Sequence, residues 1–271
     1  LPPWHGAPMH SEPSTPGARR LAAVQIAVVL AVMAAWLTGM KAAGAQELLR
    51  AHLPRAWIYV SIAGNGTLGL AVLAVVLRLS REGWGSVGLS RTEPFPAIGW
   101  GLLAAVPCYL AGALAQGLVI AARGLNPTEL AGQKMQALDV LSEVPFALML
   151  PLALFVGVYE EILFRGFLLS RLITLLHLPR LTRRGATVAA VILSSGLFGL
   201  GHIYQGATGV VQTAAVGVVL CVVAVLRGNI WSCITAHAAI DAFGLLMLRL
   251  LKPMLQEVLK GAGSAADAGT P

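Results

Sequence analysis

Two adjacent glutamates at the end of an apolar segment are the first residues in this sequence suited to chemistry. Glu160 and Glu161 follow the apolar segment 145–159, and Arg165 comes four residues after Glu161. Residues four apart share a helix face, so Glu161 and Arg165 can form an ion pair that neutralises both charges. Glu160 lies about 100° further round the helix and is left free to act as a general base. The alternative is a helix end at which glutamate and arginine both meet water.

Two histidines lie in later apolar segments, each four residues from a potential partner. Phe198 and His202 share one helix face, and His237 and Asp241 share another. A carboxylate one turn from an imidazole can fix its tautomer or raise its basicity, and it can also bind a metal beside it. The alternatives are a satisfied core histidine at position 202 and a His–Asp hydrogen bond that only links helices.

The composition places these residues in a membrane. Hydrophobic residues make up 57% of the chain and charged residues 11%, whereas soluble domains have about 25% charged residues. About 20 apolar residues in a helix cross a bilayer core. Seven segments have this character: 21–40, 56–77, 95–122, 145–159, 186–200, 207–226 and 230–248. With an eighth, short interfacial or re-entrant helix at 168–178, we expect an all-α membrane protein, a polytopic bundle of seven to eight transmembrane helices.

Ionisable side chains occur inside these segments only in the second half of the chain. Of the twelve acidic residues, three lie in or at the edge of an apolar segment: Glu160, Glu161 and Asp241. Of the six histidines, two do so: His202 and His237. A charge at the bilayer centre costs about 2.5–3.5 kcal/mol, so these groups need each other or a shared aqueous cavity. They therefore indicate a functional site.

The net charge of +7 does not indicate a nucleic-acid partner, because the basic residues lie in short connections between apolar segments. Four arginines crowd one connection: Arg171, Arg180, Arg183 and Arg184. The positive-inside rule places this connection and the N-terminus in the cytoplasm, and the C-terminus outside. Abundant alanine and arginine favour the inner membrane of a bacterium. The three cysteines lack metal-ligand spacing and are expected to be buried hydrophobes.

One transmembrane domain is expected over residues 19–255, with the ionisable motifs in a core at about 145–250. A tail at 1–18, rich in proline, serine and glycine, is expected to be disordered. A flexible tail follows at 256–271, and the polar connection 123–144 has the pattern of an amphipathic helix on the membrane. The first apolar segment is longer than the core of a usual signal peptide, which favours a retained helix.

The motifs together resemble those of a known protease family. Glu-Glu-x-x-x-Arg, then Phe-x-x-x-His, then His-x-x-x-Asn or Asp is the order in the CAAX protease and bacteriocin-processing family, the Rce1-like and Abi-type intramembrane proteases. The matching segments here are 160–166, 198–202 and 237–241, and the turn at 226–231 is also similar. The resemblance covers roughly residues 155–245 and implies an intramembrane protease.

The resemblance also implies roles for single residues. Glu160 and His202 would activate a water for peptide hydrolysis, while Glu161 and Arg165 would support the site. His237 and its partner would stabilise the tetrahedral intermediate. The implied partners are membrane lipid and a peptide or protein substrate, such as a C-terminal tail or a membrane anchor.

Asp241 departs from the family pattern, because many members have asparagine at this position. An amide can donate a hydrogen bond to an oxyanion, whereas an ionised carboxylate cannot. Asp241 must therefore be protonated, orient His237 or bind a metal. Four residues would supply nitrogen and oxygen ligands for zinc: Glu160, His202, His237 and Asp241.

Two other functions are open at this point. A non-catalytic scaffold or immunity protein of the same fold could lose the carboxylates, yet all motif positions are filled. A proton-coupled transporter would use Glu160, His202 and Asp241 as a relay, but such proteins more often show inverted repeats, and the first half has no ionisable counterpart. No His-Glu-x-x-His motif occurs, and a dyad of Ser195 with His237 would have leucine at position 193 where glycine is usual.

Overall fold

The computed structural model is an all-helical bundle, as the sequence predicts. It describes residues 14–53, 57–89, 94–126, 129 and 145–268, and no strand occurs among them. The main helices are α1 (Pro16–Ala42), α2 (Ala45–His52), α3 (Trp57–Leu79), α4 (Pro94–Arg123), α6 (Phe146–Glu161), α7 (Leu169–Leu176), α8 (Arg183–Leu200), α9 (Gly206–Arg227) and α10 (Trp231–Ala268). A π-helical segment (Ile162–Leu168) joins α6 to α7, and short 3-10 turns lie at Trp84–Val87 and Ile203–Gln205.

In the described part of the chain, six helices are long and apolar enough to cross a membrane, which makes this a multi-pass membrane protein. Two of the expected segments differ from the prediction. The segment 168–178 is not a separate helix, because α6, the π-helical segment and α7 form one continuous run, Phe146–Leu176. The segment 186–200 lies in α8, which has only 18 residues and begins with two arginines.

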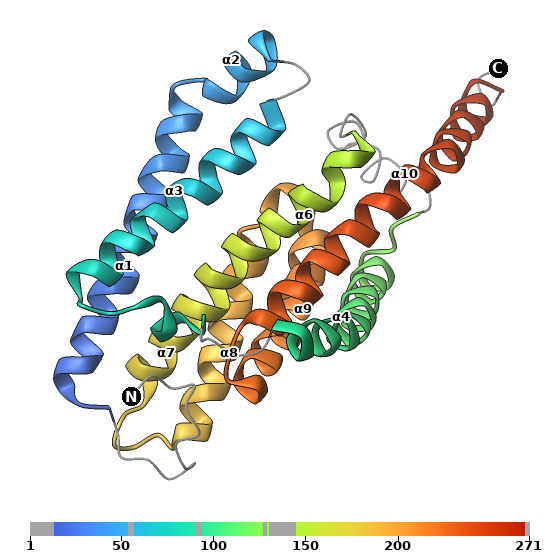
Figure 1. Cartoon of the computed structure of the whole chain (residues 1–271). Helices are drawn as coiled ribbons and strands as arrows, with labels where there is room; N and C mark the ends of the chain where they lie inside the picture. The colour runs from blue at the N-terminus through green and yellow to red at the C-terminus, as the bar shows by residue number, and fades with distance from the viewer. Residues whose placement is uncertain (1–13, 54–56, 90–93, 127–128, 130–144, 269–271) are drawn as a thin grey trace.

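The second half of the chain forms the core of the bundle (Figure 1). Helix α10 packs against α4 and α6, and α9 packs against α4 and α8. Helices α1 and α3 lie side by side at one edge, where α1 contacts α7 and α3 contacts α6. The three motifs found in the sequence therefore lie on central elements: the end of α6, the end of α8 and α10.

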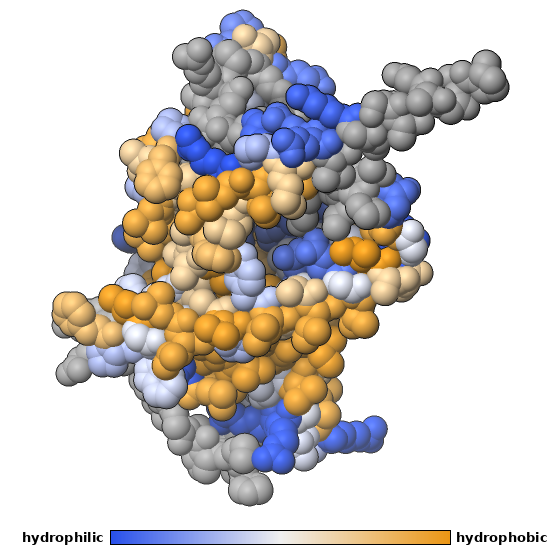
Figure 2. Space-filling model, turned by 90° about the vertical axis from the view of Figure 1, so that its right-hand side faces the viewer, coloured by the Kyte–Doolittle hydropathy of each residue, from blue (hydrophilic) through white to orange (hydrophobic). Residues whose placement is uncertain are grey.

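Apolar side chains cover much of the outside of the bundle. Seven of the large ones are at least 69% exposed: Leu79, Phe95, Leu114, Leu118, Ile203, Tyr204 and Leu226. Figure 2 shows apolar residues in a broad band, with hydrophilic residues toward both ends of the molecule. Lipid is the solvent that accommodates such a band, whereas a water-soluble protein rarely exposes apolar patches of this size.

A buried polar network ties α1, the end of α3 and α7 together. Gln25 Nε2 donates hydrogen bonds to Ser80 Oγ at 2.8 Å and to Glu82 Oε2 at 3.1 Å. Arg171 forms an ion pair with the same glutamate. Arg171 was expected in the basic connection, but it lies in α7 and is buried, because Glu82 supplies a charge partner there.

The first and last helices extend beyond the domain limits expected from composition. Helix α1 begins within the predicted tail 1–18, where the Thr15 side chain caps its first turn. Helix α10 continues to Ala268 through most of the predicted tail 256–271, in which four alanines favour a helix. Most of the expected amphipathic helix at 123–144 lies outside the described residues.

Two glycines let α10 approach its neighbours closely. A Cβ atom at Gly157 of α6 would lie 3.1 Å from the backbone nitrogen of Ala238. A Cβ atom at Gly101 of α4 would overlap the Thr235 side chain. Small residues at helix crossings are a general means by which membrane helices pack, and here they bring α6 and α10 close enough for their polar side chains to meet.

A third glycine gives a test of this packing. A Cβ atom at Gly166 in the π-helical segment would collide with the backbone oxygen of Val87. We expect Gly166→Ala to destabilise the protein by about 1–3 kcal/mol, the usual effect of overpacking. Unfolding in detergent would be compared with that of Gly196→Ala, where an added Cβ meets nothing within 4 Å. Equal stability of the two variants would contradict the close approach.

Candidate active site

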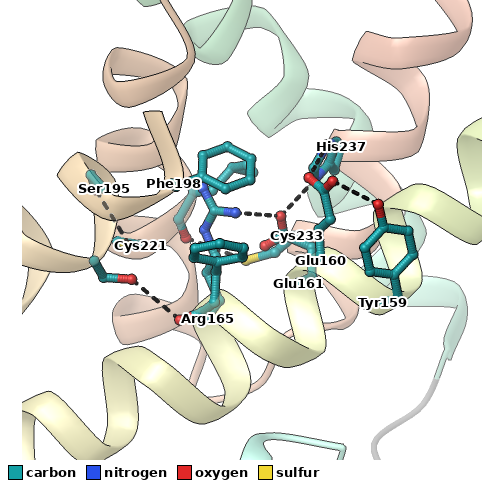
Figure 3. Close-up of polar contacts among 12 residues, drawn as sticks. Tyr159, Glu160, Glu161, Arg165, Ser195, Phe198, Cys221, Cys233 and His237 are labelled. Carbon is teal, nitrogen blue, oxygen red and sulfur yellow. Dashed lines mark hydrogen bonds and ion pairs between the residues drawn. The ribbon is translucent and has the colours of Figure 1, made fainter. Parts of the chain in front are cut away.

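The paired glutamates lie where α6 passes into the π-helical segment. Glu160 and Glu161 are the last residues of α6, and Arg165 lies within the π-helical segment. Such π-helical turns are rare and occur frequently at functional sites. Figure 3 shows both glutamates close to His237, which comes from α10.

One carboxylate oxygen of Glu161 has two partners. Its Oε1 accepts a hydrogen bond from Arg165 Nη1 at 2.8 Å, in the ion pair that the sequence spacing predicts. The same oxygen accepts a hydrogen bond from His237 Nδ1 at 2.6 Å, across 76 residues of sequence. Glu161 and Arg165 are fully buried. The spacing did not reveal the second contact, because helical periodicity within one segment does not say which other segment its face meets.

The hydrogen bond to Glu161 orients the His237 ring. Because a carboxylate only accepts, Nδ1 carries the proton and Nε2 points to the opposite side of the ring. There Nε2 faces Glu160 Oε2 at 3.7 Å and Asp241 Oδ2 at 3.6 Å. These separations exceed direct hydrogen-bond lengths, and they suit groups that share a water or a substrate atom.

Glu160 has one bonded and one unbonded oxygen. Its Oε1 accepts a hydrogen bond from the Tyr159 hydroxyl at 3.0 Å (Figure 3). Its Oε2 is buried and has no hydrogen-bond partner within the described protein. An unpaired buried acceptor costs about 1–3 kcal/mol, so Oε2 is suited to a partner that arrives from outside the protein. Sequence reasoning missed Tyr159, although its position next to Glu160 was a signal.

Phe198 connects the second histidine to this cluster. The guanidinium carbon of Arg165 lies 4.0 Å from the centre of the Phe198 ring, which is a cation–π contact. The rings of His202 and His237 both meet Phe198 edge-on, with centroids 5.0 and 5.8 Å from its own. His202 Nδ1 donates to the Phe198 carbonyl oxygen at 2.9 Å, which leaves its Nε2 as an acceptor.

Exposure increases steadily across the site. The side chain of Glu161 is fully buried, those of His237 and Glu160 are 7% and 12% exposed, and that of Asp241 is 32% exposed. The supporting ion pair therefore lies deepest, and the carboxylates that face His237 Nε2 lie nearer the surface. A substrate or a water would reach the site from the Asp241 side.

The zinc ligand set expected from the sequence is not assembled. Among the residues that the structure describes, no group of three or more His, Cys, Asp or Glu side chains is placed to hold a metal ion. His237 and His202 each use Nδ1 in a hydrogen bond, to Glu161 and to a backbone carbonyl respectively, which leaves both Nε2 atoms as acceptors. As placed here, the four side chains nevertheless do not form a metal-ligand set.

Ser195 does not face His237. It is almost fully buried, and its hydroxyl donates to Cys221 Sγ at 3.6 Å (Figure 3). This position disfavours the serine dyad. Cys221, Cys108 and Cys233 are buried free thiols, as the sequence predicts.

The fold and the site together define a polytopic membrane protein with an acid–histidine cluster buried among its helices. Residues 142–243 match the family model of type II CAAX prenyl endopeptidases of the Rce1-like group, which confirms the family resemblance for this segment. All seven motif residues lie within the match, which supports an intramembrane endopeptidase of the CAAX type. A comparison with curated proteins found no match. A comparison with solved structures likewise found none.

The buried ion pair leads to a prediction about stability. Arg165→Leu leaves the Glu161 carboxylate buried without its cation, and we expect a loss of about 3–5 kcal/mol. Arg78→Leu, at an exposed arginine of α3, serves as the control and should change stability little. Adding Glu161→Gln to Arg165→Leu should restore part of the loss, because it removes the isolated charge. Unfolding of the variants in detergent measures this, and unchanged stability of Arg165→Leu would exclude the structural role of the pair.

Proposed function

We propose that this protein is an intramembrane endopeptidase in which Glu160 and His202 activate the water that hydrolyses a peptide bond. The observation that best supports a general base is the buried Oε2 of Glu160, which has no hydrogen-bond partner among the described residues and faces His237 Nε2 at 3.7 Å. A general base must lie within hydrogen-bond reach of the proton it removes, directly or through one water. Composition supports the inner membrane of a bacterium as the location.

Hydrolysis would proceed in two steps. Glu160 Oε2 takes one proton from the water, while the acceptor Nε2 of His202 orients the other. The water oxygen bonds to the carbonyl carbon of the substrate, and an electron pair moves onto the carbonyl oxygen. The carbon–nitrogen bond then breaks, and the leaving amine takes the proton from Glu160. The hydroxyl group of the water thereby becomes part of the new carboxyl end, and its other proton becomes part of the new amino end.

His237 and Asp241 would stabilise the tetrahedral intermediate. His237 Nε2 points toward the reacting side of Glu160, and it can donate to the oxyanion when it carries a proton. Asp241 lies 3.6 Å from this nitrogen and stabilises that cationic form by its charge. The proposed role of Asp241 is therefore to act through His237, by raising the basicity of its imidazole.

The first test is the substitution Glu160→Gln, which preserves volume and removes the base. We expect at least a hundredfold loss of hydrolysis, the usual scale for a general base. The full chain in liposomes would receive two substrates: a quenched fluorescent peptide with a prenylated cysteine followed by three residues, and a bacterial membrane protein extract whose new chain ends are read by mass spectrometry. Glu257→Gln, at an exposed glutamate of α10, is the matched control.

Two outcomes would overturn the proposal. One is normal turnover by a folded Glu160→Gln protein. The other is failure of the wild-type protein to cut either substrate. Cleavage that is lost only in Glu160→Gln would support it.

Asp241→Asn tests the role of the third-motif carboxylate. Because the amide has no charge to stabilise protonated His237, we expect kcat to fall about 10-fold or more. The rate should not depend on chelator or on added zinc, since the carboxylate acts through the imidazole. Rates of wild type and variant would be measured with and without chelator. An Asp241→Asn protein as active as wild type would contradict this role, and a rate restored by zinc would favour metal binding.

A further inference from the structure

The Tyr159 hydroxyl donates a hydrogen bond to Glu160, and the Tyr159 ring packs against a glycine of α3. We propose that Tyr159 is a positioning residue for the general base, and that Gly66 makes this position possible. This inference rests on the proposed function of Glu160. It adds a contribution from the first half of the chain, outside the segment 142–243 that matches the protease family.

The hydrogen bond from Tyr159 makes the two carboxylate oxygens of Glu160 different from each other. It donates to Oε1 at 3.0 Å, and Oε2 is the oxygen that faces His237 at 3.7 Å. The distribution of the last torsion of a glutamate is broad and roughly two-fold, so packing alone does not fix the plane of the carboxylate closely. A donor held at one oxygen removes this freedom, so the unbonded oxygen points toward the reacting side in most molecules. Such prior orientation is a general source of catalytic rate.

Packing between α6 and α3 holds the tyrosine ring. The Tyr159 ring lies against Phe155 on its own helix, with centroids 5.3 Å apart. A Cβ atom at Gly66 of α3 would lie 2.6 Å from Tyr159 Cδ1 and 2.8 Å from Phe155 Cε1. Both rings therefore occupy space that only a glycine leaves open. Any larger residue at position 66 would displace them together, and the hydroxyl would move away from Glu160.

The hydroxyl is the part of Tyr159 that packing alone does not explain. A phenylalanine would fill the same space against Gly66 and Phe155 without a polar group to satisfy in the bilayer. A role in packing predicts that Tyr159→Phe is neutral for turnover. A role in orienting Glu160 predicts that the same change slows turnover, although the fold is unaffected.

Tyr159→Phe is compared with Tyr109→Phe, which removes a hydroxyl from a ring of α4 that packs on Phe243. Cleavage of the substrate that wild-type protein cuts would be measured in liposomes. We expect kcat of Tyr159→Phe to fall about 10-fold, with KM and unfolding midpoint close to wild type, because only the orientation of the base is lost. Tyr109→Phe should match wild type in all three quantities. A wild-type kcat in Tyr159→Phe, or a change confined to KM, would overturn the proposal.

Gly66→Ala tests the second half of the inference, with Gly64→Ala as its matched control. Both glycines lie in α3, but a Cβ at Gly64 meets nothing within 4 Å. We expect Gly66→Ala to reduce kcat several-fold and Gly64→Ala to leave it unchanged. In the double variant Gly66→Ala/Tyr159→Phe, the loss should be smaller than the product of the single losses, because both act through one hydroxyl. If the loss of kcat in the double variant equals the product of the two single losses, Gly66 does not act through the Tyr159 hydroxyl.

The controls separate this inference from the proposed function. Turnover by Glu160→Gln would show that Glu160 is not the general base, and Tyr159 would then have no base to orient. Inactive Glu160→Gln together with fully active Tyr159→Phe would leave the protease intact and exclude only the role of Tyr159.

Discussion

The Oε1 atom of Glu161 is the contact on which the rest of the site depends. It holds the guanidinium of Arg165 on one side and the imidazole of His237 on the other, at 2.8 and 2.6 Å. Without the arginine the carboxylate would be an isolated charge among apolar helices, and without the carboxylate the imidazole could turn. The direction of His237 Nε2, and hence the place where Glu160 and Asp241 can act, follows from this single oxygen.

A contact of this kind requires helices that approach closely, and the bundle achieves this with small residues. Gly157 brings the backbone of α6 to about van der Waals distance from that of α10, just before the two glutamates. Phe198 then closes the cluster from α8, because its ring covers the arginine and meets the rings of both histidines. Packing and charge are thus joined in one construction, since the Phe198 ring contacts a guanidinium whose Nε and Nη2 have no hydrogen-bond partner in the described part of the chain.

Much of the fold follows from the sequence, because lipid imposes a strong constraint on composition. Long uncharged segments had to be helices, and ionisable residues within them had to meet. The pairing of Glu161 with Arg165 also follows, because both lie on one helix where spacing determines proximity. Contacts between segments do not follow in this way. The bond from His237 to Glu161 and the buried position of Arg171 depend on how faces of separate helices meet, which no periodicity reports.

The π-helical segment has a consequence for how the chain tolerates insertion and deletion. Hydrogen bonds there run to the fifth residue instead of the fourth, so Ile162–Leu168 holds more residues per turn than α6 or α7. Loss of one residue would allow the segment to return to an α-helix with little rotation of the helix beyond it, because the wider turn already absorbs about one extra residue. Loss of a residue from the α-helical part between this segment and Arg171 would instead turn Arg171 away from Glu82 by about 100°. The π-helical geometry therefore sets the phase between the end of α6 that carries the two glutamates and the end anchored by Glu82.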